Sequence, residues 1–236
     1  MTQVHVSTTH EPGLAHHVNQ GRAWLEASSE GKNTASLSYA ALELRFAIER
    51  LAIHYWASLL NRRPDAEEWR SVESFKRLER EIYDLGGHQR QIDGHFRFMR
   101  TMLVAMKIEV PLITPSIVNL SRHWSTCSEY CHITWPLAST LPELRAEAHA
   151  ALLEVVRDLE PHASSAGWPL IHDQALLQLR DRFIDGKATE EDVKKHLEET
   201  GVWARVEYPD GREPHFVGEA IPPKGAATPP LLAGEA

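Results

Sequence analysis

The chain has 236 residues, a formal net charge of -8, and 42% hydrophobic and 25% charged residues. This composition excludes a chain that is disordered throughout, because seven Trp and many aliphatic residues supply a core. No stretch reaches the roughly 18 apolar residues of a transmembrane helix, the first residues lack the features of a signal peptide, and two Cys suit a reducing compartment. We therefore expect a soluble, cytoplasmic protein that contacts no membrane, and the acidic charge argues against binding of duplex DNA.

Hydrophobic periodicity and capping residues predict helices along the first two thirds of the chain. The first predicted helix covers Leu14–Ser28, and the second is capped by Thr34 or Ser36 and continues to about Arg62. A third is expected over Asp65–Leu85, after Pro64, and a fourth within 88–107. An extended crossover then leads to a fifth helix, which opens with Pro115 and Ser116, and a sixth is expected over Leu144–Leu159. The crossover is rich in Pro, which disfavours helix in the residue before it.

The pattern changes after 161–168, a stretch of Pro, Ser and Gly that predicts a linker. Two short helices are expected at 170–185 and 189–200, and Thr189 opens the second in a variant of the capping box. Alternating residues then predict a β-hairpin, and the Pro- and Gly-rich end predicts a disordered tail. The predicted fold is all-α: a bundle of about six helices over 12–160, a small α+β C-terminal unit (helix, helix, β-hairpin) over 169–217, and the tail at 218–236.

The second predicted helix is apolar on two sides, which is typical of a helix at the centre of a bundle. The residues that we expect to be buried there are Leu44, Phe46, Ile48 and Leu51. A polar strip between the two sides consists of Glu43, Arg50, His54 and Asn61. These groups either satisfy one another, point to solvent, or form a site in which an Arg holds a phosphate while a His moves a proton.

The segment 88–107 is basic within an acidic protein. It contains the motif R-x4-H as Arg90 and His95, and its further basic residues are Arg97, Arg100 and Lys107. A four-helix bundle with a long second helix, and with this motif near the start of its fourth helix, resembles the HEPN superfamily. The resemblance covers about Leu14–Met106.

This resemblance implies a metal-independent endoribonuclease of bacterial toxin–antitoxin or phage-defence type, which needs no cofactor and acts as a homodimer. In that mechanism His95 is the general base or acid for attack by a ribose 2′-OH, and Arg90 steadies the phosphate. Arg97, Arg100 and Lys107 then bind the RNA. The second choice of catalytic residues is Arg50, His54 and Glu43. The alternative is a non-catalytic helical interaction module that dimerises or docks a protein partner, with 88–107 as a plain basic helix edge.

Helix geometry sets a condition on the motif. Residues five apart lie about 140° apart around a regular helix, so Arg90 and His95 converge only if the helix begins near Ile92. A second R-x4-H joins Arg157 to His162, but Pro161 is expected to end the helix before that His.

Four potential metal ligands occur close together in the fifth predicted helix: His123, Cys127, Cys131 and His132. Zinc usually takes four ligands from two elements, and no C-x2-C or second His pair occurs elsewhere. The same face carries Leu120 and Trp124. We therefore expect both Cys to be reduced, metal-free core residues.

Overall fold

The computed structural model describes residues 13–62, 64–107, 113–114, 116–132, 135–138, 141–163, 171, 173–200, 202–206 and 215–221. Helices dominate these residues, so the predicted all-α class is confirmed. Every one of these helices is too short or too polar to span a lipid bilayer. The chain divides into two compact units, which are described one at a time.

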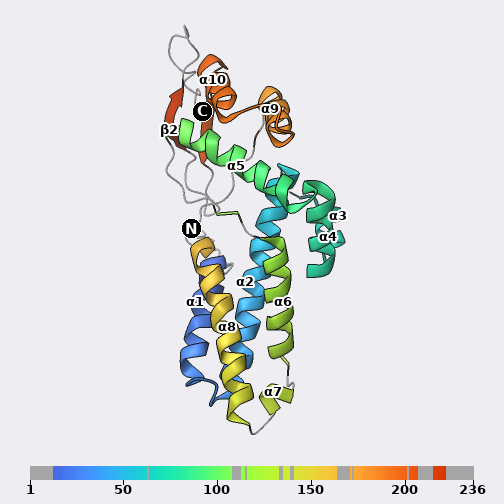
Figure 1. Ribbon diagram of the computed structural model, residues 1–236, viewed down its shortest axis with the longest axis vertical. Coiled ribbons are helices and arrows are strands. Elements are labelled where there is room, and N and C mark those ends of the chain that lie inside the picture. Colours follow the sequence, from blue (N-terminus) through green and yellow to red (C-terminus); the bar gives the residue numbers. More distant parts are fainter. Residues whose placement is uncertain are drawn as a thin grey trace, which may run out of the picture. The chain divides into compact units, whose positions relative to one another are not determined.

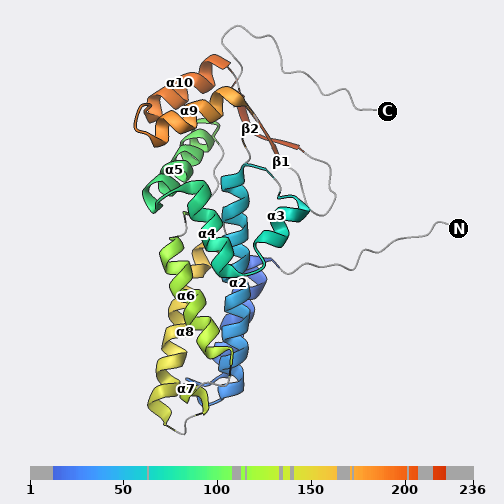
Figure 2. The same cartoon turned by 90° about the vertical axis from the view of Figure 1, so that its right-hand side faces the viewer.

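The first unit is built on four helices: α1 (Leu14–Ala27), α2 (Thr34–Leu60) as far as Ala57, α6 (Ile117–Tyr130) and α8 (Pro142–Ala163). Figures 1 and 2 show these helices side by side, with α1 and α6 antiparallel to α2 and α8. The unit also contains α3 (Ala66–Ser71), most of α4 (Phe75–Gly86) and α7 (Trp135–Ala138).

One side of α2 lies in the core of this unit. Leu44 and Ile48 are fully buried and Leu51 is 4% exposed, so the prediction that they are buried is confirmed. The prediction was wrong for Phe46, which is 40% exposed, and the neighbouring Leu42 is 38% exposed. In the N-terminal half of α2, the second apolar side is therefore only partly covered by the other helices of the unit.

The turn from α1 to α2 is held by backbone and cap contacts. The side chain of Asn33 accepts a hydrogen bond from the amide of Ser36, so Asn33 provides the cap that Thr34 or Ser36 was expected to provide. Gly31 has a φ of 89°, and a Cβ there would lie 2.5 Å from the carbonyl oxygen of Arg145 on α8. Only glycine fits this close approach of two backbones.

The single helix expected over Asp65–Leu85 is two helices, because local caps compete with a continuous helix. The Oδ1 atom of Asp65 accepts hydrogen bonds from the amides of Glu67 (2.8 Å) and Glu68 (2.9 Å), and Oε2 of Glu68 accepts one from the amide of Asp65 (2.9 Å). This capping box starts α3, and α4 begins anew at Phe75. The spacing of Val72, Phe75, Leu78, Ile82 and Leu85 predicts one apolar side along the expected helix. Leu85 is nevertheless 45% exposed.

Helix α8 begins earlier and ends later than expected, and both differences involve a proline. This helix begins at Pro142, which suits a first turn, rather than at Leu144. It also continues through Pro161 to Ala163, so the prediction that Pro161 ends the helix before His162 was wrong. A proline so near the end of a helix removes only one amide donor from the last turn. Residues 164–168 of the expected linker lie outside the described residues.

The second unit combines α5 (Gln89–Ala105), α9 (Gln174–Ile184), α10 (Glu190–Thr200) and the C-terminal ends of α2 and α4. These helices share one apolar core, whose main members are Phe98, Met99, Met102, Met106, Ile171, Leu176, Leu179, Phe183, Val193 and Leu197. The predicted cap of α10 is confirmed, since Thr189 Oγ1 accepts from the amide of Asp192 and Asp192 Oδ2 accepts from the amide of Thr189. The helix expected as the fourth of the bundle, α5, therefore packs with α9 and α10.

A pair of strands belongs to this second unit. The backbone of β1 (Val202–Val206) pairs antiparallel with that of β2 (His215–Ile221). The residues between the strands lie outside the described residues. Strand β2 continues past 218, where the tail was expected to begin, and the remainder of that tail also lies outside the described residues.

Candidate functional site

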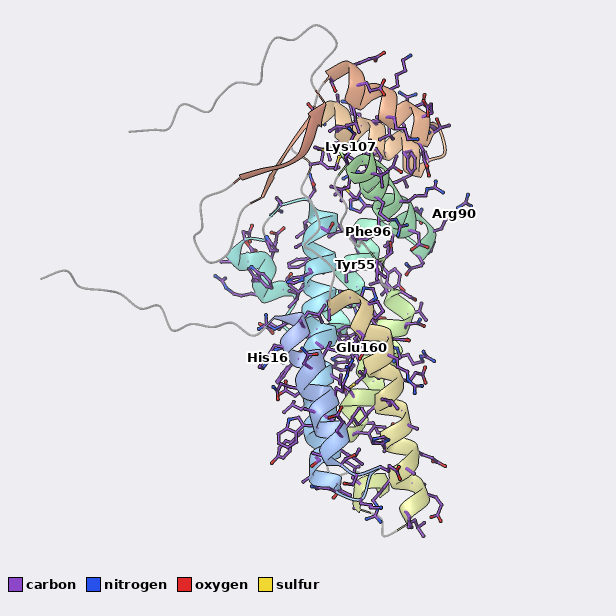
Figure 3. All side chains as sticks on the ribbon, turned by 90° about the vertical axis from the view of Figure 1, so that its left-hand side faces the viewer. His16, Tyr55, Arg90, Phe96, Lys107 and Glu160 are labelled. Atoms are coloured by element: carbon purple, nitrogen blue, oxygen red, sulfur yellow. The ribbon has the colours of Figure 1, made fainter. Side chains whose placement is uncertain are left out.

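The R-x4-H motif falls on a regular stretch of helix. His88 is the N-cap and α5 begins at Gln89, so the condition for convergence, a helix start near Ile92, is not met. Arg90 is exposed, and Figure 3 shows its side chain extending away from α5. His95 is only 3% exposed. The structure therefore places the two predicted catalytic residues on different sides of α5 and does not bring them together.

His95 is enclosed between α5 and α9. Its ring packs edge-on against Phe96, with 4.9 Å between ring centroids, and the neighbouring Gly94 lies against Ile184 of α9. The Nε2 atom is buried and has no hydrogen-bond partner among the described residues. Burial, and to a smaller extent the charge of Arg180, lower the pKa of His95 to about 4, although the charge of Asp181 opposes them. A neutral imidazole that is almost fully buried is poorly suited to exchange protons with a substrate.

Of the second-choice catalytic residues, Glu43 is engaged by another helix. The carboxylate of Glu43 is held by α1, with Nδ1 of His17 at 2.7 Å from Oε2 of Glu43. Arg50 is half-buried and His54 is exposed. At the far end of the strip, Asn61 Oδ1 accepts a hydrogen bond from the amide of Ile171 at 2.7 Å. Two members of the predicted polar strip are thus satisfied by residues outside it.

The predicted RNA-binding residues lie on the exposed part of α5. Arg97, Arg100 and Lys107 are all exposed, and Figure 3 places Arg90 and Lys107 towards opposite ends of the helix. The Arg97 guanidinium lies 4.8 Å from the centre of the Phe183 ring, a cation–π distance. These side chains form a basic edge along α5.

Two of the four potential metal ligands, His123 and Cys131, contact residues of different helices. Nε2 of His123 lies 2.7 Å from Oδ2 of Asp158 on α8, and Nη1 of Arg45 lies 3.9 Å from Sγ of Cys131. Both Cys are free thiols, and burial raises the pKa of Cys127 above its usual range. Within the described part of the chain, no three His, Cys, Asp or Glu side chains are grouped so that they could hold a metal ion.

The most conspicuous exposed surface of the first unit is apolar and lies on α2. Tyr39, Leu42 and Phe46 are 52%, 38% and 40% exposed, and they follow the spacing i, i+3, i+7 that aligns side chains along one side of a helix. We call these three residues the α2 stripe. Trp24 of α1 packs against Tyr39, with 5.0 Å between ring centroids. The sequence pattern indicates that this side of α2 is apolar, but the exposure of this side was not predicted.

Contacts between helices hold both flanks of the α2 stripe. Towards α6, Oε1 of Glu49 accepts hydrogen bonds from Trp124 Nε1 (2.8 Å) and Arg45 Nε (3.0 Å). The ring of Phe75 stacks on Trp124, with 5.2 Å between centroids and 9° between ring planes. Towards α1, the pair of His17 and Glu43 described above forms the other flank. The stripe is therefore an apolar surface between flanks whose polar groups already have partners.

Comparison with known proteins gives no guide to the function of this chain. It was compared with protein-family models, with curated proteins and with solved structures, and none of the three comparisons found a match.

Proposed function

We propose that this chain is a non-catalytic helical interaction module that forms a homodimer through the α2 stripe. The observation that carries the proposal is the exposure of Tyr39, Leu42 and Phe46 on one side of a long helix. Side chains at i, i+3 and i+7 form a ridge that packs against a second helix. Soluble monomers rarely expose a contiguous apolar patch of more than a few hundred Å² unless it binds something.

The order of residues in the α2 stripe is self-complementary. Leu42 stands between two aromatic residues, Tyr39 on one side and Phe46 on the other. A twofold axis that passes near Leu42, perpendicular to α2, makes the two α2 helices antiparallel. Tyr39 of each copy then lies against Phe46 of the partner subunit. Two aromatic contacts and one central aliphatic contact then form from the same surface on both copies.

The expected contact area suits a dimer. Aromatic side chains bury about 150–250 Å² each when fully enclosed, so half-exposed Tyr39 and Phe46 retain roughly 100 Å² apiece. Leu42 and the exposed part of Trp24 enlarge this apolar centre. A standard interface buries about 800 Å² per partner and combines such a centre with a polar rim. The flanking pairs, His17 with Glu43 and Arg45 with Glu49, provide that rim.

The test is the molar mass in solution, measured by light scattering after size-exclusion chromatography over a wide range of protein concentration. We expect a dimer for the wild-type chain and a monomer for Leu42→Glu, because two carboxylates would meet near the twofold axis. Val118→Glu is the matched control, since Val118 is 63% exposed on α6 and lies outside the stripe. A wild-type chain that stays monomeric at the highest concentration would contradict the proposal.

A second candidate function is RNA binding by the basic edge of α5. The observation that favours it is that Arg90, Arg97, Arg100 and Lys107 are all exposed on this one helix. Such a row attracts phosphates and releases counterions on binding. Because His95 is buried and turned away from Arg90, we propose binding without cleavage.

This second candidate is tested with a fluorescent single-stranded RNA in low salt. If the basic edge binds RNA, the double variant Arg97→Ala/Arg100→Ala weakens the affinity and flattens its salt dependence. The RNA stays intact in the presence of EDTA. If the wild-type chain does not bind the RNA, this candidate fails and the dimerisation proposal is unaffected.

A further inference from the structure

The described residues include three buried histidines with two different surroundings. His17 is 8% exposed and His123 is 3% exposed, and each lies 2.7 Å from a carboxylate oxygen, of Glu43 and Asp158 respectively. His95 is equally buried, but its Nε2 atom has no hydrogen-bond partner among the described residues. The first unit thus offers a counter-charge to each of its buried imidazoles, and the second unit offers none to Nε2 of His95.

The charged groups around His95 do not compensate for this lack. Helix α9 contributes Arg180, whose side chain is 18% exposed and bound to Asp181 at 2.7 Å. A protonated His95 would therefore lie near the positive charge of Arg180, and the nearby carboxylate of Asp181 is already paired with Arg180. On α5 itself, Asp93 is exposed and accepts a hydrogen bond from Gln89.

Helix α10, which also packs on α5, supplies no counter-charge. On α10, Nε2 of His196 is also buried and without a hydrogen-bond partner in the described part of the chain. The acidic residues of the first turn of α10, Glu190, Glu191 and Asp192, are exposed. A proton on His95 would therefore remain an uncompensated charge in a largely apolar contact, which is costly.

We propose that the contact between α5 and α9 is an acid-sensitive switch, in which protonation of His95 separates α9 from α5 while the first unit stays folded. The separation exposes the apolar core that these helices share, including Phe98 and Phe183, whose rings pack with 5.6 Å between centroids. The switch acts on the second unit alone, because each buried histidine of the first unit already lies beside a carboxylate.

The direction of the pH dependence follows from linkage. The folded-state pKa of His95, about 4, lies below the ordinary histidine value of 6.5, so the folded unit prefers the neutral ring. The stabilisation is complete above about pH 6.5 and is lost as the pH falls from 6.5 towards 4. Uptake of one proton on opening raises the opening equilibrium constant by at most about tenfold for each unit of pH in this window.

The experiment is hydrogen exchange of the full chain at several pH values from 7 to 5, which stays above the ordinary pKa of Asp and Glu. Peptides from α5 and α9 report on the switch, and peptides from α1 and α8 serve as the internal reference. After correction for the intrinsic rate of exchange, we expect opening of α9 to increase about sevenfold between pH 6 and pH 5. Opening of α1 and α8 should change little.

Variants assign the effect to His95. His95→Phe keeps an aromatic ring but has no titrating group, so the opening of α9 should no longer involve uptake of this proton and should depend less on pH. His95→Gln serves the same purpose if His95→Phe folds poorly. His132→Gln, which removes an exposed histidine, should keep the wild-type profile. The proposal is overturned if α9 shows no excess opening at pH 5, if α1 and α8 open equally, or if both His95 variants keep the wild-type slope.

Discussion

The imidazole of His17 and the carboxylate of Glu43 are 2.7 Å apart and join α1 to α2. Glu43 belongs to the second-choice catalytic group, with Arg50 and His54, and the contact gives its carboxylate a structural role. The ring of His17 also lies 5.5 Å from that of Phe46, so the same pair supports the α2 stripe. A residue that the sequence offers as a catalytic carboxylate thus holds two helices together.

Removal of Glu43 should destabilise the protein. Glu43→Ala leaves the buried ring of His17 without its acceptor, which we expect to cost about 1–3 kcal/mol in the free energy of unfolding. Glu43→Gln retains an acceptor oxygen and should cost less. Urea denaturation measures both, with Glu26→Ala, an exposed carboxylate on α1, as the control. Equal losses for Glu43→Ala and Glu26→Ala would show that the contact contributes nothing.

The buried side of α2 should dominate the stability of the first unit. Leu44 is fully buried, and Leu44→Ala is expected to lower the free energy of unfolding by about 2–5 kcal/mol, because it leaves a cavity. Val118→Ala removes an exposed apolar side chain and should change it by about 0.5 kcal/mol or less. Denaturation that is equally sensitive to both changes would be inconsistent with a core at Leu44.

The turn between α1 and α2 should not accept a side chain. Gly31→Ala puts a Cβ in the left-handed region and against the carbonyl oxygen of Arg145, so we expect a loss of about 3 kcal/mol or more. Gly186 also has a positive φ, of 73°, but a Cβ there has no atom within 4 Å. Gly186→Ala should therefore cost only about 1–2 kcal/mol. Thermal melting of both variants separates backbone strain from the clash.

The sequence predicts features of this fold that depend on local interactions. The bounds of α1 and α10 follow from periodicity and from caps such as Thr189 with Asp192, which involve neighbouring residues only. The break between α3 and α4 is also encoded locally, because Ser74 Oγ accepts a hydrogen bond from the amide of Arg77 at the start of α4, but the apolar spacing across the break favours one helix.

Tertiary neighbours decide the features that the sequence did not predict. Two apolar sides on α2 are compatible with burial of both or with one exposed docking surface, so the exposure of Phe46 cannot be inferred from the pattern. The burial of His95 depends on α9, which is about 90 residues later in the chain. For the same reason Arg90 and His95 match a motif in sequence while lying on different sides of α5.

The most direct test of the proposed homodimer is disulfide cross-linking at the expected twofold axis. Leu42→Cys is made in a Cys131→Ser background, with Cys127 left in place because it is buried. An antiparallel pair of α2 helices brings both copies of position 42 close to the distance of about 5.5–6 Å between Cα atoms that a disulfide requires. Mild oxidation should then give a covalent dimer for Leu42→Cys and a monomer for Val118→Cys in the same background. Failure of Leu42→Cys to cross-link, or equal cross-linking of both variants, would contradict the account.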